Sequence, residues 1–370
     1  MKIKNRVYIT ATSSSSCAGE DDKTLFHNIC KGNSGIKTDK NYFYGSAPAI
    51  GKLCSNNTFH EELLLLCQNI LDQSSLENFK DTLLIIGSSV GGMARTEEIY
   101  FETQNYKNID PNYHHINTIV NVLNKKFAFY DDISFSTACT SSANAIGYAK
   151  EVLSKGVYKN ALVVGIDSLS QTTVGGFLTL GVLSSQPCKP FDVSRDGMNV
   201  AEAIACVLLE SIPSTNAVEV CGVGYSSDAY HMTHPHPDGK GAVSAMSKAL
   251  IMASLKPEGI DYINAHGTGT IANDNAEANA IATLFPHKPY VSSTKSITGH
   301  TLGAAGALEA IIACMAIKEQ ILPQNTFLDT PENSTLNLPV LSLESKIDYV
   351  LSNSFAFGGN NCSLIFGKVK

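Results

Sequence analysis

The 370-residue chain is predicted to fold as a layered α/β protein built from two similar βα halves. Short apolar segments typical of strands alternate with longer segments typical of helices, a pattern that favours crossover connections between strands. The composition, with 44% hydrophobic and 16% charged residues, suits buried layers. One turn-and-helix unit also recurs faintly, at residues 137–155 and again at residues 298–319. We therefore expect one interlocked unit in which the two repeats face a shared centre.

The elements are expected in the following order. The first strand covers residues 1–10, whose apolar stretch is too short for a signal peptide. Further strands are expected at residues 81–87, 161–167, 203–210, 218–226, 261–264, 348–355 and 362–366. Helices are expected at residues 60–72, 113–125, 141–155, 241–255, 274–284 and 302–319. A polar break with a proline at residues 212–215 divides the chain into halves of residues 1–212 and 213–370.

Charge and apolar patterning exclude several classes of partner. The formal net charge is −7 and no block of Lys and Arg occurs, which argues against nucleic acid. No apolar run is long enough to insert in a bilayer, so we expect a cytoplasmic protein. The 10 cysteines are scattered without paired spacing, which predicts reduced thiols. His231, His234 and His236 stand close together, but two prolines in their loop argue against a metal site.

The strongest functional signal is a cysteine placed where a strand runs into a helix of small residues. Cys139 follows the strand-like residues from Ser134 and precedes a helix expected to begin near Ser141. At a helix N-terminus, the free N–H groups and the helix dipole favour a thiolate. His266 and His300 lie in turns rich in Gly and Thr, where they can donate hydrogen bonds or move a proton. The set predicts acyl-thioester chemistry with Cys139 as the nucleophile.

Four motifs extend this set and carry a family resemblance. They are Thr-Ala-Cys-Thr-Ser at 137–141, Asn-Ala-His-Gly-Thr-Gly-Thr at 264–270, Ser-Thr-Lys-Ser-Ile-Thr-Gly-His-Thr-Leu-Gly-Ala-Ala-Gly at 293–306, and Asn-Ser-Phe-Ala-Phe-Gly-Gly-Asn-Asn at 353–361. One motif alone would be a weak signal, but four in this order are specific. The chain resembles the elongating β-ketoacyl-acyl-carrier-protein synthases, the decarboxylating condensing enzymes of fatty-acid and polyketide synthesis. The resemblance implies a thiolase-like, five-layered αβαβα fold.

The resemblance also implies a role for each matching residue. Cys139 would attack an acyl-carrier-protein thioester and hold the acyl chain, with the N–H groups of Cys139 and Phe357 as the oxyanion hole. His266 and His300 would stabilise the enolate formed when malonyl-acyl-carrier protein loses CO2. Lys295 would fix the charge and orientation of the histidine pair, and Glu309 would steady that lysine. No resident cofactor is implied, because the substrates are carried on phosphopantetheine.

Further positions match the family less directly. Thr268 and Thr270 would bond the phosphopantetheine arm. Phe355 and Phe357 are either aromatic core or a gating ring beside Gly358 and Gly359. Asp228 and Thr233 would be gate residues in a mobile loop at residues 226–233. The family's pocket floor falls at or beside Thr96, which alternatively caps the helix that follows.

Some segments depart from the family pattern, and two other functions are considered beside the condensing enzyme. Residues 53–60 lack the basic side chains that usually help to dock the carrier protein, and residues 175–177 and 183–188 look more like synthases of specialised lipids such as aryl polyenes. A dimer is implied, either with a second copy or with a relative that lacks the cysteine. The rivals are a degradative thiolase, which needs a second catalytic cysteine where Cys362 does not fit, and a chain-length-factor-like partner, which would lack Cys139.

Overall fold

Ten strands form two sets of five with the same internal order. The computed structural model describes residues 5–40, 42 and 47–369, and its main strands hydrogen-bond in the order β10-β9-β13-β14-β8-β1-β7-β6-β4-β5. The first set comprises β1 (Tyr8–Ser16), β4 (Thr82–Gly87), β5 (Asp131–Phe135), β6 (Asn160–Asp167) and β7 (Ala203–Glu210). The second comprises β8 (Val218–Ser227), β9 (Tyr262–Asn264), β10 (Tyr290–Ser292), β13 (Tyr349–Phe355) and β14 (Asn360–Lys368).

The two sets repeat one topology. When the five strands of a set are numbered in chain order, their order across the sheet, read from the outer edge, is third, second, fourth, fifth, first in both sets. In both sets the first three of these strands are parallel and the last two pairings are antiparallel. The sets meet where β1 pairs with β8, at Tyr8 with Glu219 and Ile9 with Val218. The faint repeat in the sequence is therefore a repeated strand arrangement, and the chain passes between the sets after Glu210 and before Val218.

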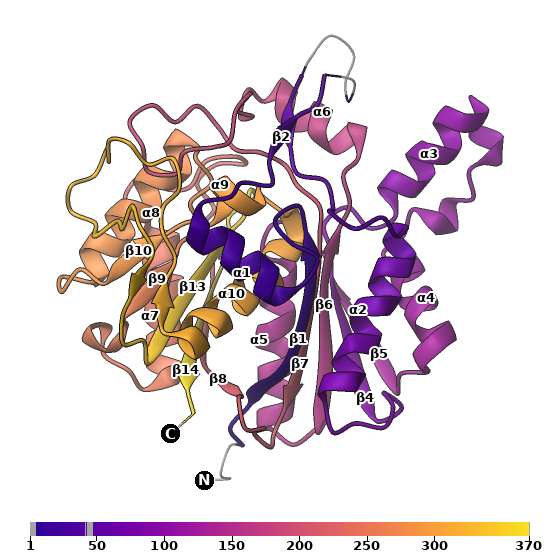
Figure 1. Ribbon diagram of the computed structural model, residues 1–370, viewed down its shortest axis with the longest axis horizontal. Coiled ribbons are helices and arrows are strands. Elements are labelled where there is room, and N and C mark those ends of the chain that lie inside the picture. The colour runs from indigo at the N-terminus through magenta and orange to yellow at the C-terminus, as the bar shows by residue number, and fades with distance from the viewer. Residues whose placement is uncertain (1–4, 41, 43–46, 370) are drawn as a thin grey trace.

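Helices make the other three layers (Figure 1). α2 (Phe59–Gln73) and α4 (Asn117–Phe127) cover the outer face of the first set, and α7 (Lys240–Ala253) and α8 (Ile271–Leu284) cover that of the second. α5 (Ser141–Ser154) and α10 (Ala305–Glu319) lie between the sets, where α5 packs on β6 and α10 on β13. The order is αβαβα, as the sequence predicted. α10 is buried on all sides from Ala305 to Ile317, which is why its sequence is apolar all round.

The remaining elements connect these layers. They are α1 (Asp22–Lys31), α3 (Met93–Thr103), α6 (Gln171–Thr179), α9 (Lys295–Thr298), the short turns Tyr106–Asn108, Pro111–Tyr113, Pro257–Gly259 and Leu302–Ala304, and the small ladders β2 (Lys37–Thr38) with β3 (Ala49–Ile50) and β11 (Ile321–Leu322) with β12 (Leu343–Glu344). α3 stands away from the body at the upper right of Figure 1. No helix in the described part of the chain is long and apolar enough to span a bilayer.

Two expected elements are misplaced. The first strand is Tyr8–Ser16 rather than residues 1–10, of which residues 1–4 lie outside the described residues. The strand continues through Ser13–Ser16, which are buried in the sheet, and the hydroxyls of Thr12 and Ser14 donate to Asp22 at 2.5 and 2.6 Å. The helix expected at residues 113–125 begins at Asn117, because a separate short turn ends at Tyr113.

Candidate active site

A strained turn presents Cys139 at the start of α5. β5 ends at Phe135 and α5 begins at Ser141, and Ala138 between them has φ +52°, which is unfavourable for a residue with a side chain. Side chains of the same segment hold the turn: the Ser141 hydroxyl donates to the Ala138 carbonyl at 2.7 Å, and Asn144 Nδ2 donates to Thr137 Oγ1 at 2.8 Å. The thiol is left 8% exposed and lines a cavity.

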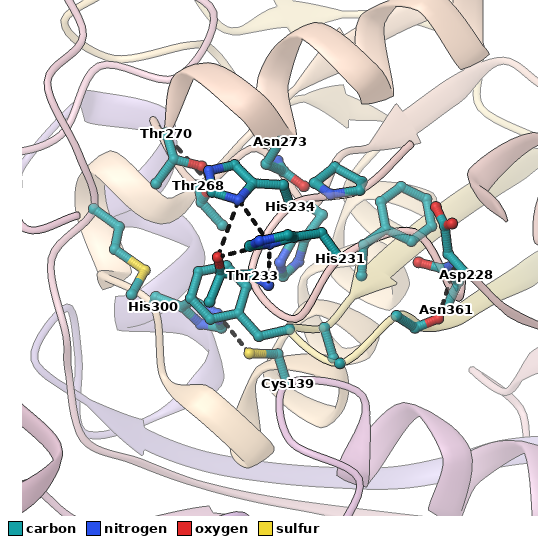
Figure 2. Close-up of a pocket in the computed structure, with 18 of the residues that line it drawn as sticks. Cys139, Asp228, His231, Thr233, His234, Thr268, Thr270, Asn273, His300 and Asn361 are labelled. Atoms are coloured by element: carbon teal, nitrogen blue, oxygen red, sulfur yellow. Dashed lines mark hydrogen bonds between the residues drawn. The ribbon is translucent and has the colours of Figure 1, made fainter. Parts of the chain in front are cut away.

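His300 lies against this thiol with its proton on a defined nitrogen. Nε2 of His300 is 3.1 Å from Cys139 Sγ (Figure 2). The backbone N–H of Leu302 donates to Nδ1 of His300 at 3.2 Å, so Nδ1 is an acceptor and the proton of the neutral ring is on Nε2. The backbone of His300 is fixed as well, because its N–H donates to the Asn199 carbonyl at 2.7 Å. His300 therefore acts as a hydrogen-bond donor toward the sulfur.

His266 is the second buried imidazole of the site. Its ring centroid is 5.2 Å from that of His300, with the two rings nearly perpendicular at 85°. Glu277 of α8 anchors the His266 turn by accepting the N–H groups of His266 and Gly267 at 2.9 and 2.8 Å, and it also accepts from Asn353 at 3.0 Å. Sequence reasoning missed Glu277, because a carboxylate that binds backbone N–H groups leaves no motif of its own. Burial raises the pKa of Glu277 to about 7.

Burial and a nearby cation keep both histidine rings neutral. Lys295 pairs with Glu309, and both side chains are buried. Burial lowers the pKa of His266 and of His300 well below the ordinary value, and the Lys295 cation lowers both further. At neutral pH each ring therefore offers one N–H donor and carries no charge. Such donors stabilise negative charge that develops on an oxygen between them.

The resting thiol differs from the sequence expectation. Burial raises the pKa of Cys139 to about 11, although Lys295 and the backbone N–H groups of Phe357 and Cys139 lower it. Burial therefore outweighs the helix N-terminus, and the resting sulfur is protonated rather than a thiolate. Both N–H groups lie close enough to the sulfur to lower its pKa, and the family resemblance assigns the same two groups to the oxyanion hole.

The cavity above Cys139 collects most of the other predicted residues. Its lining comprises Cys139, Phe177, Met198, Asp228, His231, Thr233, His234, Pro235, His266, Thr268, Thr270, Asn273, His300, Phe355, Ala356, Phe357, Gly358, Gly359 and Asn361. Figure 2 shows Thr233, His231 and His234 gathered at one side of it and Cys139 at another. Cys362 does not line the cavity and is buried in β14.

Two loops at the cavity are hydrogen-bonded to each other. The Asp228 N–H donates to the Gly359 carbonyl at 2.7 Å, and the Gly358 N–H donates to the Met232 carbonyl at 2.8 Å. The segment that carries Phe355 and Phe357 is therefore coupled to the segment that carries Asp228 and Thr233. Gly358 and Gly359 have φ values of +85° and +82°, which glycine adopts without strain.

The two threonines form a pair with a buried support. Thr268 Oγ1 and Thr270 Oγ1 are 2.8 Å apart. The N–H of Gly269 between them donates to Asp274 at 3.2 Å, and Asp274 lies 3.5 Å from the Arg195 guanidinium. Both charged groups are buried, which holds the turn against α8.

Thr96 lies apart from this cavity. It is buried inside α3, which begins at Met93, so it is not the helix cap that one interpretation expected. Its hydroxyl donates to the Met93 carbonyl at 2.8 Å and lies 3.0 Å from His114 Nδ1. Among the residues described, no group of His, Cys, Asp and Glu has a geometry that could hold a metal ion.

Comparisons with known proteins identify the family. The Beta-ketoacyl synthase N-terminal domain family matches residues 61–213, and the corresponding C-terminal domain family matches residues 217–329. The chain is 33% identical to 3-oxoacyl-acyl-carrier-protein synthase 2 of Coxiella burnetii, over 99% of each chain. It is 31% identical to the chloroplastic 3-oxoacyl-acyl-carrier-protein synthase II of Arabidopsis thaliana, over 99% of this chain and 76% of that one.

Solved structures give the same result. A ketosynthase from Xenorhabdus doucetiae, determined in complex with its chain length factor, aligns with a TM-score of 0.90 and 31% identity over 99% of this chain and 98% of that chain. A β-ketoacyl synthase from Burkholderia phymatum aligns with a TM-score of 0.88 and 28% identity over 99% of this chain and all of that chain.

Proposed function

The chain belongs to the β-ketoacyl synthase family, and from that premise we propose that it catalyses decarboxylative condensation of an acyl thioester with malonyl-acyl-carrier protein. The observation that carries the proposal is the contact of 3.1 Å between His300 Nε2 and Cys139 Sγ, beside a second neutral imidazole. The reaction would give a β-ketoacyl-acyl-carrier protein for fatty-acid, polyene or polyketide synthesis.

The first half of the reaction loads the acyl chain. Cys139 loses its proton to solvent, and the thiolate attacks the thioester carbonyl of the acyl donor. The N–H groups of Cys139 and Phe357 stabilise the oxyanion of the tetrahedral intermediate. The pantetheine sulfur leaves with its electron pair and takes up a proton, so one thioester is exchanged for another.

The second half forms the carbon–carbon bond. The malonyl carboxylate leaves as CO2, and the electron pair moves into an enolate whose oxygen accepts hydrogen bonds from His266 and His300. The enolate carbon attacks the acyl-Cys139 carbonyl, and the Cys139 sulfur leaves and regains a proton. Burial keeps both rings neutral with help from the Lys295 cation, and Glu309 pairs with Lys295. Thr268 and Thr270, at the cavity wall, would bond the pantetheine arm.

We propose that the two hydrogen-bonded loops control entry to the cavity. Phe355 and Phe357 would gate one side, and Asp228 and Thr233 would move with them because the loops share hydrogen bonds. The role of Thr96 in the acyl pocket stays a prediction.

The partners follow from the same proposal. An acyl carrier protein would deliver both substrates on phosphopantetheine, with no resident cofactor in the chain. The Xenorhabdus ketosynthase was determined with its chain length factor, and we infer that this chain also pairs with a second subunit, a copy or a relative. We place the protein in the cytoplasm and divide it into halves at residues 212 and 213, between β7 and β8.

The test is replacement of the nucleophile. Cys139→Ala should abolish condensation and remove the acyl adduct seen by intact-mass spectrometry after incubation with an acyl donor, while the fold survives. Cys206→Ala is the matched control, because Cys206 is also a buried thiol but lies in β7 away from the cavity. An acyl adduct on another cysteine of the Cys139→Ala protein would refute the assignment.

A further inference from the structure

A buried carboxylate outside the cavity connects the two halves next to His300. Asp167 ends β6 and is 1% exposed. Its neighbours are all donors: Ser88 Oγ at 2.6 Å, the Ser89 N–H at 3.0 Å, the Ser89 hydroxyl, the Val90 N–H at 3.1 Å and the Gly303 N–H at 2.6 Å. An ionised carboxylate accepts at both oxygens and suits this surrounding. The first four donors belong to the segment after β4, but Gly303 belongs to the other half of the chain.

The segment that Asp167 holds is the turn that sets the proton of His300. Leu302, which donates its N–H to His300 Nδ1, has φ +52°, an unfavourable conformation for a leucine. Such a conformation persists when neighbouring contacts fix it on both sides. On one side His300 is bound to Asn199, and on the other the Gly303 N–H is bound to Asp167.

The close approach of Gly303 supports the same reading. A Cβ atom on Gly303 would lie 2.6 Å from the Ser89 backbone nitrogen and 2.8 Å from Asp167 Oδ2. The turn is therefore pressed directly onto the carboxylate. Ser89 Oγ also accepts the Gly303 N–H at 3.1 Å, so the serine bridges the two.

We propose that Asp167 is a positioning residue that holds the Leu302–Gly303 turn so that His300 keeps its proton on Nε2, facing Cys139. Without Asp167 the Gly303 N–H loses its shorter bond, and Leu302 is free to relax to negative φ. The Leu302 N–H would then turn away from Nδ1, and His300 could carry its proton on Nδ1 instead. In that state Nε2 presents a lone pair to the sulfur and to the substrate oxygen, where a donor is needed.

The tautomer can be measured directly by NMR on protein with 15N-labelled histidine. The His300 signals are assigned by their loss in His300→Ala, and coupling to the ring protons shows which nitrogen carries the proton. In the unaltered chain we expect Nε2–H. In Asp167→Ala we expect a large population of Nδ1–H, and in Ser89→Ala, a milder change that is safer for folding, a smaller shift in the same direction.

The matched control is Asp192→Ala. Asp192 is also 1% exposed and accepts from Ser194, Asp329 and Thr330, but none of its contacts is with residues 300–303. An unchanged His300 tautomer in both Asp167→Ala and Ser89→Ala would overturn the proposal. An equal change in Asp192→Ala would overturn it as well, because general loosening would then explain the result.

A kinetic measurement adds the link to the proposed function, on which this part alone rests. Removing a donor from an oxyanion site lowers rates by about 100-fold to 1,000-fold, so partial loss in Asp167→Ala should slow malonyl decarboxylation by roughly 10-fold to 100-fold and acyl loading by less. Equal slowing of both steps would contradict the positioning role. Absence of both steps in the unaltered chain would refute the proposed function instead, and the tautomer measurement would still stand.

Discussion

The proton on His300 and the proton on Cys139 are controlled by different groups. A backbone N–H directs the first to Nε2, whereas burial keeps the second on the sulfur. Loading needs a thiolate and an oxyanion hole, whereas decarboxylation needs two neutral donors around the enolate oxygen. The two half-reactions should therefore respond differently to single substitutions.

Removing either histidine should separate the half-reactions. His266→Ala and His300→Ala should each slow malonyl decarboxylation by about 100-fold or more, since one charge-stabilising donor is lost. Acyl loading should fall less, and less in His266→Ala than in His300→Ala, because His300 contacts the sulfur. The two steps are measured by CO2 release and by mass of the acyl-protein. His287→Ala, whose ring bonds the Ile260 carbonyl away from the site, is the control. A loss of loading with decarboxylation intact would reverse these roles.

The pH dependence of thiol reactivity should follow from the raised pKa of Cys139. With a pKa of about 11, the thiolate fraction and the rate of alkylation by iodoacetamide should rise about tenfold for each pH unit from 7 to 9, without a plateau. Mass spectrometry of the Cys139 peptide measures this. Lys295→Met combined with Glu309→Gln should lower the rate at each pH, because the cation that lowers the Cys139 pKa is gone. A plateau near pH 7 would show that the resting group is a thiolate.

Whether a site residue can be predicted from the sequence depends on how that residue acts. Cys139, His266, Lys295 and His300 stand in local motifs, so their placement in one site follows from their spacing and neighbours. Asp167 and Glu277 act by accepting backbone N–H groups of other turns; Gly303 is 136 residues from Asp167, and Gly267 is 10 residues from Glu277. Such partners can be identified only in the folded structure. The pKa of the Cys139 thiol likewise depends on burial, which a sequence motif does not show.

Among the elements, the two central helices are positioned by small residues. A Cβ atom on Gly306 at the start of α10 would lie 2.5 Å from the Ala143 nitrogen of α5, and one on Gly165 of β6 would lie 2.7 Å from the Ala307 Cβ. Because α5 begins two residues after Cys139 and α10 begins five after His300, this close packing sets the distance between the two catalytic groups. The helices were predictable from their apolar runs, but their separation was not.

Replacing Gly306 with a larger residue should therefore lower the stability of the fold and disturb the distance between the two catalytic groups. We expect Gly306→Ala to lower the free energy of unfolding by about 1–3 kcal/mol, since the extra methyl group overpacks the contact. Urea denaturation followed by circular dichroism measures it. Gly176→Ala in α6 is the matched control: no atom lies within 4 Å of the added methyl group, so stability should stay equal or rise by up to about 1 kcal/mol. Equal effects of the two changes would argue against tight packing between α5 and α10.

The element boundaries show where sequence patterns are weak. The buried helices and the apolar strands have nearly the expected bounds, because their periodicity is set by burial. β1 was misplaced because serine is usually exposed, and here Ser13–Ser16 are buried between layers, where the Ser14 hydroxyl donates to Asp22, the Ser16 hydroxyl accepts from the Ala18 N–H, and the Ser15 hydroxyl has no partner among the described residues. α3 was expected only in the interpretation that made Thr96 its cap, and its start was misplaced, since it packs mainly against its own short turns and lacks a face turned to the core.

At the scale of the whole molecule, the protruding helix α3 and the turns after it carry exposed aromatic side chains. The protruding segment around α3 exposes Phe101, Tyr106 and Tyr113, with 48%, 75% and 46% of their surface accessible. β5 lies at one end of the sheet, and within the described part of the chain one of its edges has no partner strand. A free strand edge and a group of exposed aromatic side chains are both features of surfaces that associate with another subunit.

We therefore expect at least a dimer at micromolar concentration. Light scattering should give a mass at least twice the 39.6 kDa of one chain. Phe101→Asp with Tyr106→Asp should shift the mass toward that of a single chain, because burying a carboxylate in an apolar contact is costly. Ile251→Asp on α7, also exposed at 76%, is the control and should leave the mass unchanged. A monomer in the unaltered chain would contradict this assembly.

The repeated strand order has a consequence for how such a site can arise. Two like units packed about an axis are the plan of a homodimer, so this chain has the form of two ancestral subunits joined end to end by gene duplication. In each copy the helix between the third and fourth strands starts near that axis, yet one copy supplies a thiol there and the other an imidazole. Once the two copies are joined in one chain, their sequences can diverge, and each copy can supply a different catalytic group. The same divergence between two whole subunits yields a related subunit that keeps the fold but lacks the cysteine.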